Sequence, residues 1–220
     1  MIIYADYPIY CSSCNHYCTG NYFKYKTYNW GYRGFPQLTG KVDVYLDDRL
    51  VPHIFAEQEN DAYFVQGYLH AKFRLWQMEF QIYAAGGRLS EILGDNDPRI
   101  LNFDRNMRRL GMGYAAEIAL QEVEKDPVIK SQCDAYTSGV NAYIETLTES
   151  SLPLEYKLIG YKPEKWSNLK TSLFLKYMSY DLAAHDDDFE LTNAKSYFGA
   201  EDFAKLFPLL QDSLDPIIPR

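Results

Sequence analysis

The sequence lacks any long apolar run, because charged residues or glycine interrupt its hydrophobic stretches every few residues. A membrane-spanning helix needs about 20 consecutive, mainly apolar residues, so we expect no membrane partner. The N-terminus also lacks the basic-then-apolar order of a secretory signal. An excess of basic residues is missing as well, and the net charge is −8. Because nucleic-acid binding needs a basic footprint, we expect no nucleic-acid partner.

Histidine is scarce, and no recognisable catalytic set surrounds the few that are present. Hydrolytic catalysis needs a nucleophile, a base and donors for the oxyanion. The sequence has no G-x-S-x-G elbow and no convincing Ser-His-Asp arrangement. His53 could act as a base, but a lone histidine in a strand is more often a hydrogen-bonded structural residue. We therefore assign no catalytic residue to this chain.

Ser167 and Lys170 fit the S-x-x-K pattern, in which a lysine helps to activate a nucleophilic serine. The motifs that accompany this pattern in serine β-lactamases are absent. A serine at a helix start also has a capping role. We interpret Ser167 as an N-cap.

Cysteine is rare, and three of the four cysteines lie close together near the N-terminus. Cys11, Cys14, His16 and Cys18 have the ligand types of a tetrahedral zinc site. Structural zinc sites usually draw ligand pairs from two separated loops, and the remaining Cys133 is far away on a predicted helix. We therefore expect free or locally paired thiols in an irregular Cys- and Tyr-rich leader over residues 1–38. The sharp change in composition near residue 37 suggests a foreign or mis-started segment.

What is present is enough apolar material for a sizeable core, since 47% of the 220 residues are hydrophobic. Val42, Val44 and Leu46 alternate with polar residues, which predicts a half-buried strand. A turn and a second strand through residue 56 complete a hairpin. Pro52 lacks an N–H for the ladder, so we place it at a sheet edge or bulge.

Residues 60–94 predict the central helix of the fold. Apolar residues recur there at spacings of four and three, which places them on one helix face. We expect Asn60 to be the N-cap and Gly86-Gly87 to end the helix. The predicted face consists of Phe64, Tyr68, Ala71, Leu75, Met78 and Ile82.

Four further helices are predicted: over residues 114–123, from Asp126-Pro127 onward, over 167–184 and over 201–210. Residues 99–110 are predicted to form a charged connection between helices. Asp126 followed by a proline is a typical helix start. Asp104, Arg105, Arg108 and Arg109 predict either solvated charge or an ion-pair network. The helix after Asp126 has a predicted buried stripe of Ile129, Cys133, Tyr136, Val140, Ile144 and Leu147.

Residues 185–190 concentrate carboxylates next to a helix end. Oxygen ligands at this density suit calcium, although the glycine and the spacing of an EF-hand are missing. A solvated acidic loop is the alternative.

Several motifs together resemble the penicillin acylase family. Val51-Pro52-His53-Ile54 is similar to the Pro-His-Ile strand of that family. The rest of its signature is matched by Asp61-Ala62, Gln66-Gly67-Tyr68, His70-Ala71, Arg74-Leu75, Gln77-Met78-Glu79 and Gly87-Arg88-Leu89 with Glu91. Family members are N-terminal nucleophile amide hydrolases, made as one precursor that is cut into an α chain and a β chain. This sequence resembles the α chain over residues 39–220.

The resemblance implies an α+β fold, mainly helical with an N-terminal β-hairpin, which a β-rich partner completes to four αββα layers. It implies that the nucleophilic serine is the first residue of the β chain, whose α-amino group acts as base. It places Met178, Asp181 and Leu182 near the acyl pocket. It implies a calcium site with Glu190 as ligand and Asp188 as second choice, and a periplasmic or exported location.

We therefore expect the α-chain-like part of an amide hydrolase acting on a linear N-acyl amide, whose partner is a β chain or the remainder of one precursor. An acylase for acyl-homoserine lactones or other N-acyl amides is the alternative within the enzyme class. A truncated, non-catalytic interaction module is the alternative outside it.

Overall fold

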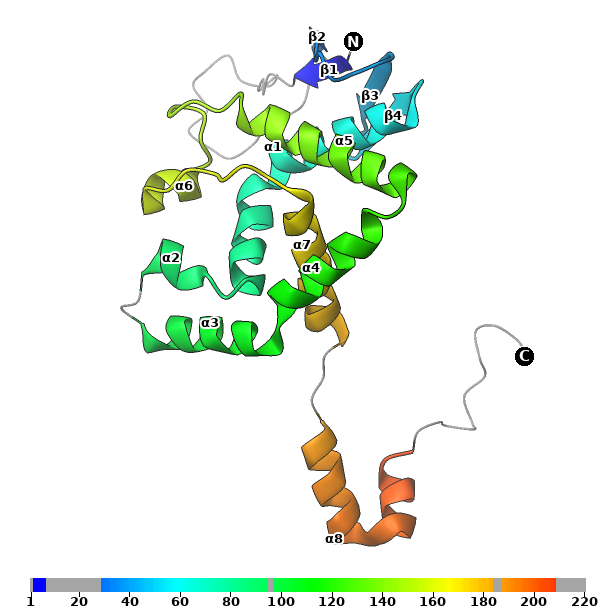
Figure 1. Cartoon of the computed structure of the whole chain (residues 1–220), viewed down its shortest axis with the longest axis vertical. Coiled ribbons are helices and arrows are strands. Elements are labelled where there is room, and N and C mark those ends of the chain that lie inside the picture. The colour runs from blue at the N-terminus through cyan, green and yellow to red at the C-terminus, as the bar shows by residue number, and fades with distance from the viewer. Residues whose placement is uncertain (1, 7–28, 95–96, 184–186, 209–220) are drawn as a thin grey trace, which may run out of the picture. The chain divides into compact units, whose positions relative to one another are not determined.

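The structure is a computed structural model that describes residues 2–6, 29–94, 97–183 and 187–208. It divides into two units, Met1–Met178 and Ser179–Arg220. The first unit combines one small sheet with most of the helices (Figure 1). No helix in the described ranges is both long and apolar enough to cross a membrane. The helices are α1 (Glu59–Ala85), α2 (Leu89–Leu93), α3 (Pro98–Leu110), α4 (Met112–Val123), α5 (Pro127–Ile144), α6 (Leu154–Ile159), α7 (Asn168–Ala183) and α8 (Asp188–Leu206).

The sheet has four strands in the order β2-β1-β3-β4. β3 and β4 pair antiparallel, which confirms the predicted hairpin. β1 runs parallel to β3 and antiparallel to β2, and both β1 and β2 come from the segment in which no regular structure was expected. The cysteine cluster of that segment lies outside the described residues. The strands are β1 (Ile2–Asp6), β2 (Asn29–Arg33), β3 (Val42–Leu46) and β4 (Pro52–Ala56).

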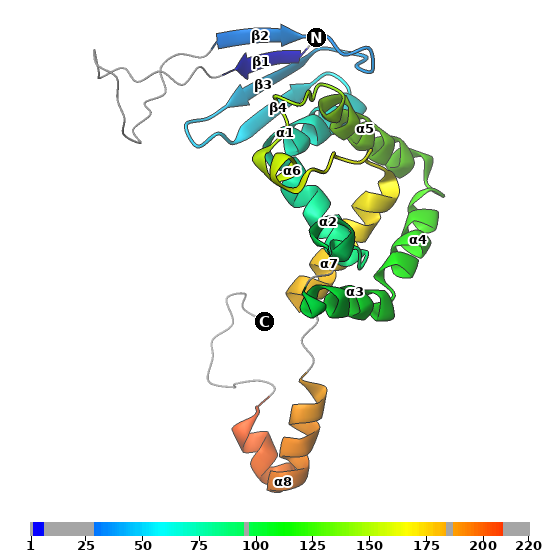
Figure 2. The same cartoon turned by 90° about the vertical axis from the view of Figure 1, so that its left-hand side faces the viewer.

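The β3–β4 hairpin covers one side of a hydrophobic cluster that it forms with α1. Val42, Val44 and Leu46 are at most 5% exposed, as their alternation predicts. Val42 and Val44 pack against Phe64 and other residues of α1. Pro52 begins the edge strand β4, as predicted. Figure 2 shows the sheet as a layer at one end of α1 and α5.

Helix α1 is the centre of the core, and all six residues of its predicted apolar face are buried. The helix ends at Ala85 with Gly86 as its C-cap, and Gly87 takes a left-handed φ of 62°. The N-cap prediction was wrong: the cap is Gln58, and Asn60 lies inside the first turn. Asn60 instead donates through Nδ2 to Ser131 Oγ on α5, at 2.7 Å. A tertiary hydrogen bond therefore engages the side chain that we expected to cap the helix.

Helix α5 starts as predicted, since the Asp126 carboxylate accepts from the backbone N–H groups of Val128 and Ile129. It crosses α1 so closely that two glycines meet the facing backbone. A Cβ on Gly139 would lie 1.8 Å from the Phe64 carbonyl oxygen, and one on Gly67 would lie 2.1 Å from that of Tyr136. This backbone contact joins the two longest elements of the first unit.

The predicted stripe of α5 is buried only in part. Val140 is fully buried, but Ile129 is 44% exposed. The stripe prediction was therefore wrong for Ile129, in the first turn of α5.

Residues 99–110 form helix α3, so the prediction of a charged connection was wrong. Asp97 caps this helix through the backbone N–H of Arg99, and Pro98 occupies its first turn. The same Asp-Pro signal had identified α5. The high charge of the segment reflects one exposed face of α3.

Helix α7 starts after Ser167, whose Oγ accepts from Lys170 N at 3.4 Å, in agreement with the predicted cap. Helix α8 is interrupted at Gly199, which has a φ of 79°. The predicted helix over 201–210 is therefore the second arm of a longer element that ends at Leu206.

Candidate functional site

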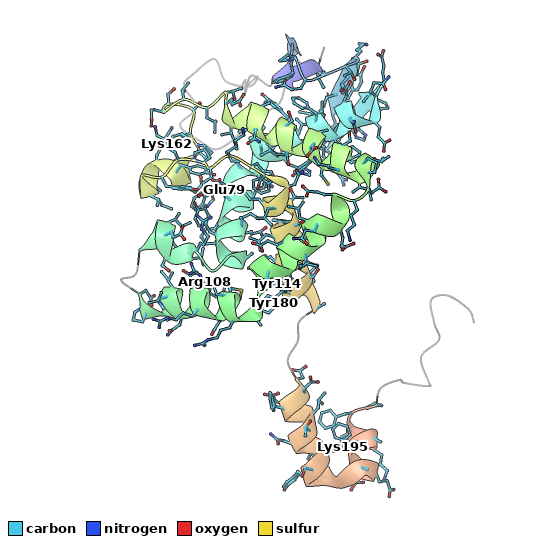
Figure 3. All side chains as sticks on the ribbon, in the orientation of Figure 1. Glu79, Arg108, Tyr114, Lys162, Tyr180 and Lys195 are labelled. Carbon is cyan, nitrogen blue, oxygen red and sulfur yellow. The ribbon has the colours of Figure 1, made fainter. Side chains whose placement is uncertain are left out.

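A network of ionised and hydroxyl side chains surrounds Glu79, in the interior of the first unit (Figure 3). Glu79 is 1% exposed and accepts from Tyr156 Oη at 2.6 Å and from Glu164 N at 2.8 Å. Lys170 Nζ lies 3.6 Å from Glu79 Oε1 and 2.9 Å from Glu164 Oε2. Helix α1, the segment before Trp166 and helix α7 are thereby joined through one pair of carboxylates and one ammonium.

The outer half of this network is formed around Glu164. Arg88 donates to Glu164 at 3.0 Å and to Glu91 at 2.8 Å. Tyr83 Oη donates to Glu164 at 2.8 Å and lies 2.6 Å from Tyr161 Oη. The Arg88 guanidinium also lies over the Tyr83 ring, 4.5 Å from its centroid. The GRLSE stretch of the sequence therefore continues the buried network toward the surface.

The pKa values of Glu79 and Glu164 are shifted in opposite directions. Burial raises the pKa of Glu79, and this effect exceeds the lowering by Tyr156 and Lys170. Burial would also raise the pKa of Glu164, but hydrogen bonds from Lys170, Arg88 and Tyr83 lower it to about 2. Burial, followed by the charge of Glu79, raises the pKa of Tyr156. Since a salt bridge or hydrogen bond engages each of these groups, the network offers no free nucleophile.

The S-x-x-K pair is not a catalytic dyad. Lys170 directs its ammonium to Glu79 and Glu164. Ser167 faces the backbone N–H of Lys170, as a helix cap does.

Of the four charged residues that the prediction named in α3, two are solvated as predicted, whereas Asp104 and Arg108 bind mainly backbone groups in place of the predicted ion-pair network. Asp104 is buried and accepts from the backbone N–H groups of Leu89 and Ser90, and from the Ser90 hydroxyl. Arg108 donates to the Gly87 carbonyl at 2.8 Å. These two side chains hold the turn between α1 and α2. Arg105 and Arg109 are exposed.

Neither described histidine belongs to a catalytic arrangement. His53 is half exposed, with Nε2 3.6 Å from Asp47 Oδ2. His70 Nδ1 lies 3.0 Å from Tyr136 Oη, and burial lowers the pKa of His70. His16 and His185 lie outside the described residues.

The residues expected to line an acyl pocket lie on α7. Met178 is half-buried and ends the first unit. Asp181 and Leu182 belong to the second unit and are exposed, Leu182 to 69%. The residues that the structure describes bury none of these three side chains completely.

Glu190 and Asp188, the expected metal ligands, lie in the first turn of α8 and are exposed. Within the described ranges, no group of three His, Cys, Asp or Glu side chains could hold a metal ion. The neighbouring residues 184–186 are outside those ranges. Both carboxylates therefore need further oxygen ligands from elsewhere to form a calcium site.

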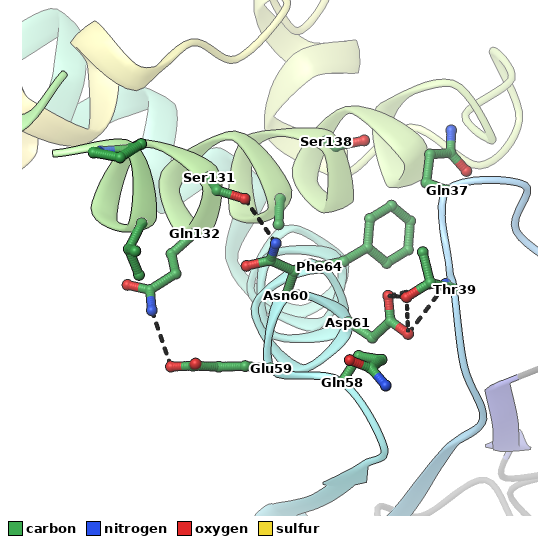
Figure 4. A pocket seen from close by; sticks show the side chains of 13 residues that line it. Gln37, Thr39, Gln58, Glu59, Asn60, Asp61, Phe64, Ser131, Gln132 and Ser138 are labelled. Carbon is green, nitrogen blue, oxygen red and sulfur yellow. Dashed lines mark hydrogen bonds between the residues drawn. The ribbon is translucent and has the colours of Figure 1, made fainter. Parts of the chain in front are cut away.

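A polar cavity of about 590 Å³ lies between the start of α1, helix α5 and the segment before β3 (Figure 4). Asn60 and Ser131 form one hydrogen bond across it, and Gln132 donates to Glu59 at 2.9 Å. Asp61 is buried at its wall and accepts from the Thr39 and Gly40 backbone. Since its carboxylate is satisfied by the chain itself, we assign this cavity no ligand.

Comparison with known proteins identifies relatives over most of the chain. Residues 41–214 match the penicillin amidase family. The chain is 37% identical over 136 residues to penicillin acylase 2 proenzyme of Pseudomonas sp. strain SE83, covering 62% of this chain and 17% of that protein. It is 34% identical over 177 residues to acyl-homoserine lactone acylase QuiP of Pseudomonas aeruginosa, covering 80% of this chain and 20% of that protein. The chain thus spans about a fifth of the length of these relatives.

A solved structure has the same fold. It is a thermostable penicillin G acylase from Alcaligenes faecalis, with a TM-score of 0.67 and 20% sequence identity. The match covers 83% of this chain and 99% of the matched chain. The mainly helical α+β fold with its N-terminal hairpin is thereby confirmed.

Proposed function

The chain belongs to the penicillin amidase family, and we propose that it is the α-chain-like part of an amide hydrolase that acts on a linear N-acyl amide. In this proposal a β-chain-like partner, or the remainder of one autoproteolytic precursor, supplies the nucleophilic serine, its α-amino base and the oxyanion donors. The proposed location is the periplasm or another exported compartment.

The observation that carries this proposal is the difference in coverage between the two kinds of relative. The chain covers 17% of a protein named a proenzyme, yet 99% of a separate chain in a solved penicillin G acylase. This difference in coverage supports the proposal that the chain corresponds to one part of a longer protein.

The surface of the second unit supports a missing partner. Helix α8 has no buried residue among those described. Phe189 is 74% exposed, Tyr197 84% and Leu206 56%. Large exposed apolar patches on soluble proteins commonly mark interaction sites. We propose that the β-like partner covers these exposed apolar residues of α8.

The proposed contribution of this chain to the substrate site is one wall of the acyl pocket, formed by Met178, Asp181 and Leu182. Met178 and Leu182 would contact the apolar part of the acyl group. Asp181 would disfavour acyl groups with a nearby negative charge and would accept from a donor on the substrate. An acyl-homoserine lactone is the second candidate substrate, since 80% of the chain aligns with a QuiP acylase.

We expect amide hydrolysis only when this chain is expressed together with a β-like chain that begins with serine. The assay is the release of a chromogenic amine from N-acyl anilides with short and long acyl chains. The matched control is the same pair with the first serine of the β-like chain replaced by alanine. A stable monomeric chain that never associates with a β-like chain, and never gives activity with it, would support the non-catalytic module instead.

We also propose a calcium site in which Glu190, with Asp188 as second choice, completes a set of ligands from the partner. The Glu190→Ala variant of the assembled protein should lose most of its calcium-dependent increase in melting temperature, because one charged ligand is removed. Glu201→Ala is the matched control, since Glu201 lies on the same helix and pairs with exposed Lys205. Equal calcium stabilisation of the Glu190 variant and the unmodified protein would rule out this ligand.

A further inference from the structure

We propose that the first unit contains a binding site for a small carboxylic acid with an apolar body, separate from the proposed acyl pocket. The site is a cavity of about 340 Å³ at the junction of α1, α5 and α7. This volume lies within the range of small-molecule pockets, about 300–1,000 Å³. All residues that line it belong to the first unit.

The walls of the cavity present little polar surface because four of the lining residues pair their polar atoms with one another. Trp166 donates through Nε1 to Thr171 Oγ1 at 2.9 Å. Tyr136 Oη lies 3.0 Å from His70 Nδ1. The rings of Trp166 and Tyr136, together with Phe174 and Met78, therefore present carbon surface to the cavity. Such walls favour an aromatic ring or a medium alkyl chain.

Arg74 provides the charge that selects a carboxylate. It lines the cavity and is exposed, so it lies at the rim. Within the described part of the chain, its guanidinium has no hydrogen-bond or ion-pair partner. Arg88 and Arg108, by contrast, donate to Glu164 and to the Gly87 carbonyl. A planar guanidinium next to an apolar wall suits the bidentate binding of one carboxylate.

The backbone at this position also departs from the regular helix. Arg74 has φ −141° and ψ 19° inside α1. No proline or glycine lies within four residues of it. The helix is therefore irregular at Arg74, the residue whose unpaired guanidinium lines the cavity.

The ligand class also has a chemical relation to the proposed function, and this link alone rests on that function. Hydrolysis of an N-acyl amide releases a carboxylic acid with an apolar body. At a second site for that acid, distinct from the acyl pocket, the fraction of first units with bound acid would rise with the concentration of product.

The test is titration calorimetry of the purified 220-residue chain at pH 7.5 with 3-phenylpropanoate, and in parallel with the neutral 3-phenylpropanamide. We expect saturable binding of the acid and at least about tenfold weaker binding of the amide, because a charge-assisted hydrogen bond is lost. Arg74→Gln should weaken acid binding to the level of the amide, and Arg74→Lys should recover part of it. The matched control is Arg105→Gln, which removes an exposed arginine of α3 and should leave binding unchanged.

Two results would overturn the proposal: no saturable binding of the acid, or equal acid affinity of the unmodified chain and Arg74→Gln. Circular dichroism of each variant confirms that it is folded, and recovery by Arg74→Lys distinguishes loss of charge from loss of structure. The experiment needs no partner chain and no activity. Its failure would therefore leave the hydrolysis assay unaffected, and failure of that assay would leave this binding site intact.

Discussion

Replacing Gly139 with alanine is expected to destabilise the first unit by about 3 kcal/mol or more, at or above the upper end for overpacked cores. The added Cβ would lie 1.8 Å from the carbonyl oxygen of Phe64 and 2.7 Å from its carbon. Both contacts are with backbone, so no side-chain rotation can relieve them. Helices α1 and α5 would have to separate, and the core residues that pack between them would lose contact. Gly67→Ala should have a similar effect, since its Cβ would meet the backbone of Tyr136.

The measurement is the free energy of unfolding in urea, followed by circular dichroism. Gly113→Ala is the matched control: Gly113 lies within α4, and an added Cβ would have no neighbour within 4 Å. Because alanine favours the helix, this control should be more stable than the unmodified chain by roughly 0.5–1 kcal/mol. If Gly139→Ala unfolded at the same urea concentration as the unmodified chain, the close crossing of α1 and α5 would be wrong.

Glu79→Ala is expected to cost about 3–5 kcal/mol, the range observed when one partner of a buried ion pair is removed. The substitution leaves the Tyr156 hydroxyl and the Glu164 backbone N–H without their acceptor. It also leaves Lys170, whose side chain is 13% exposed, with Glu164 as its remaining counter-charge. Glu79→Gln keeps an acceptor oxygen and should therefore be less damaging.

Urea unfolding of the Glu79 variants checks this prediction, with Glu122→Ala as control. Glu122 pairs with Lys125 on the surface, where both side chains are more than 60% exposed. Such pairs contribute about 0–1 kcal/mol, so the control should change little. Similar unfolding free energies for Glu79→Ala and Glu122→Ala would show that the buried network does not stabilise the fold.

Local patterns in the sequence predicted much of the fold. The alternation of Val42, Val44 and Leu46 identified the buried face of the hairpin, because successive side chains of a strand face opposite sides. The spacing in α1 identified its buried stripe for the corresponding reason in a helix. Asp126-Pro127 identified the start of α5. The identical signal at Asp97-Pro98 was available, but the high charge of the following residues led to the wrong prediction of a connection.

Less of the candidate site could be predicted from the sequence. Glu79, Glu164 and Lys170 are distant along the chain, and no periodicity links them. The sequence indicated Glu79 only as part of a family motif, and it suggested a catalytic pattern for Lys170. The cavity beside Arg74 depends on the angle between α1 and α5, which no local pattern encodes. Asn60 illustrates the same limit: its side chain suits a cap, but a serine on another helix engages it.

The sequence by itself determined which residues are apolar, at what period they recur and where helices can start, and these properties identified the hairpin, helix α1 and the family. Only the tertiary structure decided which polar groups are buried next to one another. That outcome depends on the crossing of α1 and α5 at Gly67 and Gly139, because this contact sets the distance between the helices. Burial then requires each enclosed charge to have a partner, which Glu79 finds in Tyr156 and Lys170, whereas Arg74 at the cavity rim remains accessible to a ligand.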